Sequence, residues 1–174
     1  MGKLLNVFFD ICLLRAGPQA LPSSSFLLSA AALAGLLTGT IVIVDALGNV
    51  FTAFMAQLLD LLLLAMLLMT MFRLKGFESR FTQAATALFG CSALINLVTL
   101  PLPLLAPEEG VGQQVAGPAF FLYLALIIWA LVVVGHIFRH ALEIHLVRGI
   151  LIAVGYFFAV NLAVQMLFLP EGPQ

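Results

Sequence analysis

The residue best placed for proton chemistry is Asp60, which lies inside the apolar run "FTAFMAQLLDLLLLAMLLMTMF". An ionised carboxylate that faces lipid is costly, so it must face inward, find a partner or carry a proton. Gln57 precedes it by three residues and shares its face of a helix. No Lys or Arg is expected at the same depth. We therefore expect Asp60 to be protonated and to donate a hydrogen bond to another helix.

Other polar residues are expected near the depth of Asp60. Counted from the basic ends of the helices at about 1.5 Å per residue, Asp60 lies about 18 Å deep, Asn96 about 22 Å and Asn161 about 21 Å. The sequence predicts an intramembrane polar layer in which Asn96 or Asn161 accepts from Asp60, made of Asp60, Gln57, Asn96, Asn161 and Thr40. Such a layer suits helix packing, a proton or ion path, or contact with a partner's transmembrane helix.

A second group has the spacing of a metal site. In "GHIFRHALEIHLVRG", His136, His140 and Glu143 fall at i, i+4 and i+7, on one face of a helix. Two histidines at this spacing can ligate a metal, and a glutamate can add a third ligand. A polar helix end is the more ordinary interpretation, because cations are favoured at a helix C-terminus and near lipid headgroups. We predict no metal and no other cofactor.

Common catalytic signatures are absent from the sequence. It contains no HExxH, GxSxG, Walker-type glycine-rich loop or GxGxxG. Cys12 and Cys91 lack CxxC or zinc-site spacing, and we interpret both as apolar core residues. We therefore predict that the protein is not an enzyme, although His136 and His140 leave a lipid-modifying activity as a remote alternative.

The elements that must position these residues follow from composition. Hydrophobic residues make up 63% of the 174 positions and charged residues 9%, against roughly 45–50% and about 25% in soluble domains. Five apolar segments have the length of about 20 residues that spans a bilayer. We place them at residues 25–47, 50–72, 81–105, 118–138 and 147–169. Because these runs are long and lack the alternation of barrel strands, the sequence predicts an all-α, polytopic transmembrane bundle of five helices.

The charges predict an orientation. All seven basic residues fall on one side of the five-span arrangement, while the charges expected on the other side are acidic: Asp45, Glu108, Glu109 and Glu171. By the positive-inside rule, the N-terminus is cytoplasmic and the C-terminus lies on the far side of the membrane. A net charge of −1 and the short loops argue against a nucleic-acid partner.

The N-terminal segment is too short to span. On a helix, Lys3, Asn6 and Asp10 form a narrow polar stripe beside apolar residues. This pattern predicts a helix in the headgroup layer, or a helix simply packed against the bundle. The expected organisation is therefore a cytoplasmic interfacial helix and turn over residues 1–24, a membrane domain over 25–169, and a short non-cytoplasmic tail over 170–174.

Small residues recur at intervals of four in two of the expected spans. Ala31, Gly35 and Gly39 form one row, and Gly155, Ala159 and Ala163 form the other. Such rows let helix backbones approach closely in lipid. We expect both rows to face protein, either within the bundle or across a subunit interface.

Three short motifs are similar to a known family. "LLRAGPQALP" (residues 13–22), "HAL" (140–142) and "RGILIAVGY" (148–156), together with five spans and a cytoplasmic N-terminus, resemble the bacterial members of the Yip family of small integral membrane proteins. The resemblance implies a bacterial inner-membrane protein that acts as a non-enzymatic adaptor.

Two functions follow as hypotheses. The first is an inner-membrane scaffold or accessory subunit that binds other membrane proteins through its transmembrane helix faces. The alternative is a small channel or proton-coupled transporter subunit that uses the Asp60 layer. The expected partners are the lipid bilayer and either another membrane protein or further copies of the chain.

Overall fold

The computed structural model describes residues 2–102 and 118–168, and within these ranges the secondary structure is entirely helical. The elements are, in order, α1 (Gly2–Cys12), η1 (Pro18–Ala20), α2 (Ser25–Leu47), α3 (Val50–Lys75), η2 (Glu78–Arg80), α4 (Phe81–Thr99), α5 (Pro118–Leu142) and α6 (Leu146–Phe168). Helices α2 to α6 are long and apolar enough to cross a membrane. Five such helices indicate a multi-pass membrane protein and confirm the predicted all-α class.

The hairpin between α2 and α3 shows how local chemistry sets the helix ends. Gly48 ends α2 with φ +69°, in the left-handed region that favours glycine. Asn49 follows, and its side chain accepts a 2.7 Å hydrogen bond from the Phe51 amide, which caps the start of α3. Gly76 ends α3 in the same left-handed conformation, at φ +72°. The chain therefore reverses direction within a few residues after α2 and again after α3.

The third predicted span was too long. We expected it to reach residue 105, but α4 ends at Thr99. Pro101 lacks an amide hydrogen and cannot donate the next hydrogen bond of the helix, which explains the earlier end. By contrast, α3 and α5 continue about one turn past their predicted ends, to Lys75 and Leu142. The expected acidic residues Glu108, Glu109 and Glu171 and the tail 170–174 lie outside the described residues.

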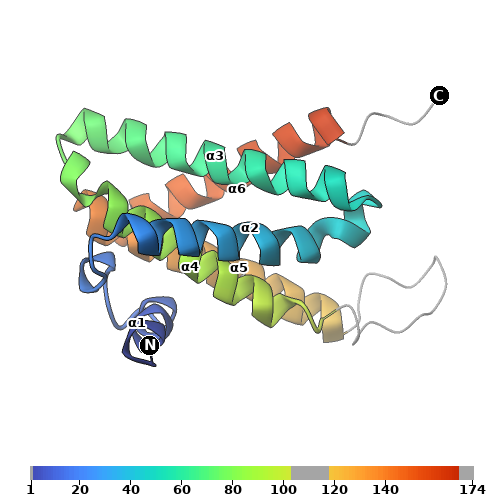
Figure 1. Ribbon diagram of the computed structural model, residues 1–174, viewed down its shortest axis with the longest axis horizontal. Coiled ribbons are helices and arrows are strands. Elements are labelled where there is room, and N and C mark those ends of the chain that lie inside the picture. Colours follow the sequence, from blue (N-terminus) through green and yellow to red (C-terminus); the bar gives the residue numbers. More distant parts are fainter. Residues whose placement is uncertain (1, 103–117, 169–174) are drawn as a thin grey trace.

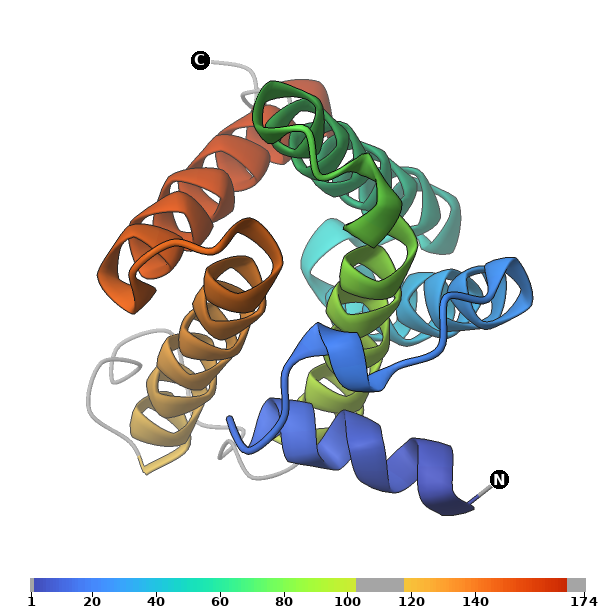
Figure 2. The ribbon, with the colours of Figure 1, turned by 90° about the vertical axis from the view of Figure 1, so that its left-hand side faces the viewer.

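Helix α4 lies at the centre of the bundle and packs against α2 on one side and α5 on the other (Figures 1 and 2). Ten of its residues are buried, more than in any other described helix. The short helix α1 runs across the long helices near one end of the bundle, where it contacts α4 and α5. A helix in this position can hold the ends of two spans together.

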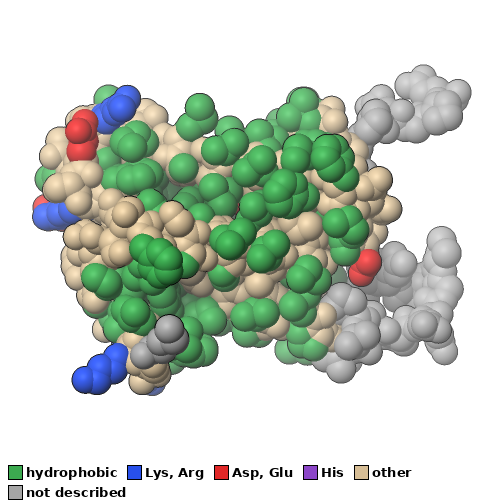
Figure 3. All heavy atoms as spheres, viewed as in Figure 1, with side chains coloured by type: hydrophobic (Ala, Val, Ile, Leu, Met, Phe, Trp, Pro, Cys, Tyr) green, Lys and Arg blue, Asp and Glu red, His purple; other side chains and the backbone are tan. Residues whose placement is uncertain are grey.

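The basic residues gather at the end of the bundle where α1 lies. Arg73 and Lys75 are in the last turn of α3, Arg139 is in the last turn of α5, and Arg148 is in the first turn of α6. On the face drawn in Figure 3, the Lys and Arg side chains all lie at this end, and an acidic side chain marks the other. The gathering of the basic residues at one end, expected from the sequence, is therefore present in the fold.

Candidate functional site

The intramembrane carboxylate of Asp60 joins two helices. Gln57, one turn earlier in α3, donates from Nε2 to Asp60 Oδ2 at 3.2 Å. Tyr156 of α6 places its hydroxyl 2.5 Å from Asp60 Oδ1 and 2.7 Å from the Asp60 backbone oxygen, so both oxygens are within reach of its proton. Each carboxylate oxygen therefore has a side-chain partner, and one of these partners ties α3 to α6.

The partner of Asp60 is not the one that we expected. Asn96 donates from Nδ2 to Thr38 Oγ1 at 3.4 Å, which joins α4 to α2. Asn161 donates instead to the Phe157 backbone oxygen at 2.8 Å within its own helix. The predicted hydrogen bond from Asp60 to Asn96 or Asn161 is therefore wrong. Equal depth in the membrane does not bring side chains together when their helices present different faces.

The remaining member of the predicted layer is also locally satisfied. The Thr40 hydroxyl is buried and donates to the Leu36 backbone oxygen at 2.7 Å. Throughout the described residues, no buried side-chain nitrogen or oxygen lacks a hydrogen-bond partner. The five residues thus form separate local hydrogen bonds instead of one continuous layer. Gln57 and Asp60 are the only two of the five joined by a hydrogen bond in the described part of the chain.

Tyr156 is the residue of this site that sequence reasoning missed. It lies within an apolar helix, and its hydroxyl is the kind of polar group that finds a partner when it is buried. A search for hydroxyl and amide donors in helices other than that of Asp60 would have included it. We considered only the asparagines and Thr40, because of their depth, and did not consider Tyr156.

The predicted metal candidates do not converge on a single point. The His136 and His140 rings are adjacent, with centroids 4.5 Å apart. Glu143, however, lies beyond the end of α5 with φ +53°, and its carboxylate forms a 2.6 Å ion pair with Arg80. The described residues contain no group of three metal-ligating side chains. The predicted i+7 position fails because α5 ends at Leu142, one residue before Glu143.

His136 instead belongs to a set of side chains that hold the N-terminal segment. Its Nε2 lies 3.0 Å from the Ala16 backbone oxygen, and since a carbonyl oxygen only accepts, Nε2 carries the hydrogen. One face of α5 also supplies Trp129, whose Nε1 donates to the Cys12 oxygen at 3.0 Å. From α4, Gln83 Nε2 donates to the Leu21 oxygen at 2.8 Å. These three side chains donate hydrogen bonds to backbone oxygens in residues 12–21, a segment whose backbone is only partly helical.

Helix α1 itself packs against the bundle through one apolar edge. Phe8, Ile11 and Cys12 are buried. The ring of Phe8 lies where a Cβ at position 90 would be, so Gly90 of α4 makes room for it. Hydrogen bonding with the Cys91 thiol lowers the pKa of Cys12, while burial acts against this change. The alternative of a helix packed against the bundle therefore has direct contacts in its favour, and the headgroup-layer location stays a prediction.

The two rows of small residues behave differently. Ala31, Gly35 and Gly39 are buried on α2, and a Cβ at Gly35 would lie 3.2 Å from the Phe89 backbone oxygen of α4. On α6, Gly155 and Ala159 are exposed, Ala163 is half-buried, and a Cβ at Gly155 would meet no atom within 4 Å. The first row packs within the bundle as expected. The second does not, so a subunit interface is the remaining prediction for it.

A pair of glycines that we did not single out makes the close contact of α6. Gly149 of α6 and Gly135 of α5 face each other, and a Cβ at Gly149 would lie well under 3.0 Å from the Gly135 backbone oxygen. The same Cβ would be 3.2 Å from the Gly135 carbonyl carbon and 3.4 Å from the Arg139 amide nitrogen. Gly135 has no small residue four positions before or after it, whereas Gly149 is followed by Ala153, which is also buried. This second small pair of α6 was visible in the sequence, and we did not single it out.

No protein-family model, curated protein or solved structure matches this chain. What its geometry offers is therefore a set of helix contacts and surfaces. A cavity of ≈ 10 Å³ beside η1, lined by Gln19, Arg80 and Gln83 among others, has room for about one water molecule. The exposed row of small residues on α6 is the feature whose packing within the bundle remains unexplained.

Proposed function

We propose that the protein is a non-enzymatic scaffold or accessory subunit of the bacterial inner membrane. In this proposal, the exposed face of α6 binds a transmembrane helix of another membrane protein or of a second copy. The single observation that carries the proposal is Gly155, which is exposed at the middle of α6 with open space where its Cβ would be. Ala159 continues the same exposed row one turn later.

The physical argument concerns glycine in a helix that faces lipid. A glycine in a helix interior costs about 1 kcal/mol relative to alanine, so it is usually accompanied by a packing benefit. Gly149 has that benefit inside the chain, since it lies against α5. Of the 23 residues of α6, only Gly149 and Ala153 are buried. A partner helix packed closely over Gly155 and Ala159 would supply the contacts that offset the cost of glycine at position 155.

The hydrogen bonds of Asp60 with Gln57 and Tyr156 support a packing role more than a transport role. Both carboxylate oxygens have side-chain partners, and the Tyr156 hydroxyl joins α3 to α6. This link fixes α6 against the rest of the bundle at the level of Gly155, one residue before Tyr156. A fixed helix loses less freedom on binding a partner, which favours association.

The orientation follows from the cationic end of the bundle. We place that end and the N-terminus in the cytoplasm, and the C-terminus in the periplasm. Helix α1 would then lie in the cytoplasmic headgroup layer, with its exposed Leu5 and Phe9, and Leu13 directly after it, toward the acyl chains. Kinship with the bacterial Yip family, on the motifs given above, fits the same adaptor role.

The test is purification of the tagged protein from its own membranes in mild detergent, followed by native mass measurement and mass spectrometry. We expect a reproducible partner, or a homo-oligomer, at a fixed ratio. The double variant Gly155→Leu with Ala159→Leu should lose it. The control Ala34→Leu places the same added side chain on an exposed position of α2 and should retain it. A monomer without any partner, or equal loss in the control, would contradict the proposal.

A further inference from the structure

Three arginines lie in or next to segments that meet at the C-terminal end of α5. Arg139 lies in that turn. Residues 15–19 pack over the same turn: His136 donates to the Ala16 oxygen at 3.0 Å, and Gln19 Nε2 donates to the His140 oxygen at 3.0 Å. These two hydrogen bonds place the adjacent Arg15 beside the end of α5.

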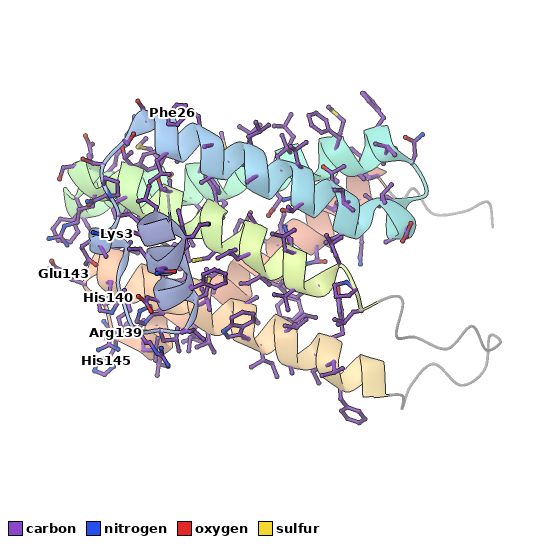
Figure 4. The ribbon with its side chains drawn as sticks, turned by 60° about the horizontal axis from the view of Figure 1, so that its bottom comes forward. Lys3, Phe26, Arg139, His140, Glu143 and His145 are labelled. Atoms are coloured by element: carbon purple, nitrogen blue, oxygen red, sulfur yellow. The ribbon has the colours of Figure 1, made fainter. Side chains whose placement is uncertain are left out.

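The third arginine arrives from the other side of the same turn. Arg148 is in the first turn of α6, directly before Gly149. The close approach of Gly149 to the backbone of Gly135 and Arg139 holds this first turn against the last turn of α5. Figure 4 shows Arg139 at this end of the bundle, with His140 and His145 near it.

These arginines lack the partners that two other cations at this end have. Arg80 has the Glu143 carboxylate at 2.6 Å, and Lys75 donates to the Leu142 backbone oxygen at 2.8 Å. Arg15, Arg139 and Arg148 are exposed, and none of them forms an ion pair with any acid of the described residues. Three such arginines in segments that meet at the end of α5 make this region positively charged, so an anion would be stabilised there.

We propose that Arg15, Arg139 and Arg148 bind the phosphodiester of an anionic phospholipid in the leaflet at the basic end. Arginine suits this ligand because its planar guanidinium donates two parallel hydrogen bonds to phosphate oxygens. Basic pockets between transmembrane helices are a known setting for anionic headgroups. The proposal needs only the insertion of the five helices in a membrane and does not depend on the scaffold role.

The lipid, and not free phosphate, is the occupant that fits the surroundings. On either side of Arg148 in the sequence, α6 exposes the large apolar side chains of Val147 and Leu151. The linker exposes Leu13 two residues before Arg15. An acyl chain can lie along these side chains while its headgroup meets the arginines, whereas a free anion would gain only the polar contacts.

The test is native mass spectrometry of the purified chain with phosphatidylglycerol, with phosphatidylcholine of the same acyl chains, and with inorganic phosphate alone. We expect selective retention of phosphatidylglycerol. Each arginine removed should weaken retention roughly five-fold, so Arg139→Gln with Arg148→Gln should weaken it roughly 25-fold. Arg73→Gln removes an exposed cation at the end of α3 and serves as the matched control, with retention unchanged.

Three results would overturn the proposal. The first is unchanged retention in the double variant, and the second is an equal loss in Arg73→Gln, which would indicate a general effect of surface charge. The third is displacement of the lipid by inorganic phosphate at equal concentration, which would indicate an anion site without lipid selectivity. Circular dichroism and elution volume check that the double variant folds. If it does not fold, Arg15→Gln, which changes an exposed linker residue, tests the same site.

Discussion

Two glycines of α6 give opposite predictions when each is changed to alanine. At Gly149 the added Cβ would overlap the backbone oxygen of Gly135, at well under 3.0 Å, and would lie 3.2 Å from the Gly135 carbonyl carbon. Backbone atoms cannot rotate away as a side chain does, so the two helices must separate. At Gly155 the added Cβ would meet nothing within 4 Å.

The magnitudes follow from these distances. Overpacking of a well-packed contact costs about 1–3 kcal/mol, and we expect Gly149→Ala to fall in the upper part of this range because the overlap is with backbone. Gly155→Ala adds no overlap and gains helix propensity, so it should be neutral or stabilising by up to about 1 kcal/mol. The expected difference between the variants is therefore about 2–4 kcal/mol.

The assay is unfolding of the purified monomer by increasing mole fraction of SDS in mixed micelles. Circular dichroism reports helix content, and the single tryptophan, Trp129, reports the packing of α5 against the N-terminal segment. We expect the midpoint to fall for Gly149→Ala and to stay or rise for Gly155→Ala. Equal destabilisation by both substitutions, or a larger effect at Gly155, would refute the assignment of the α5 contact to Gly149.

Three further predictions follow from the contacts. Tyr156→Phe removes the hydroxyl that joins α3 to α6. In the same SDS assay it should cost about 0.6 kcal/mol, the average for hydrogen bonds between membrane helices, and at most about 1.7 kcal/mol. An unchanged midpoint would show that this hydrogen bond does not stabilise the bundle. Asp60→Asn keeps an acceptor oxygen at nearly the same volume, so the SDS midpoint should change less than in Tyr156→Phe, and a larger loss would show that the negative charge is needed. Gly90→Ala would press on the Phe8 ring and lift α1, so maleimide labelling of Cys12, which is buried in the native chain, should become faster; labelling as slow as in the native chain would contradict the packing of α1.

The helices could be predicted from sequence because the bilayer imposes a single rule on them. Each span needs about 20 apolar residues, and nothing else in the chain has that length. The end of α2 at Leu47 and the start of α3 at Val50 were therefore correct, since Gly48 and Asn49 mark the turn. The end of the third span was wrong because residues 100–105 are apolar yet contain Pro101, and hydropathy does not register a missing amide donor.

The site contacts could be predicted only in part, because they depend on how each helix is rotated. Gln57 and Asp60 pair as expected, since a spacing of three residues fixes their relation within one helix. The link from Asp60 to Tyr156 crosses between helices, and depth alone gave Asn96 or Asn161 instead. The same limit applies to the glycines: the row with Gly155 and the pair of Gly149 with Ala153 are both visible in the sequence, and only the contact with Gly135 shows which of them packs against α5.

The most direct test of the proposed role is photo-crosslinking from α6 in intact membranes. A photoreactive residue replaces Ala159 in one variant and Ala34 of α2, an equally small exposed residue, in the other. The account predicts one dominant protein crosslink from position 159, to a partner or to a second copy, and only lipid adducts from position 34. Lipid adducts alone at both positions, or the same proteins from both, would contradict the claim that this face of α6 binds a transmembrane helix.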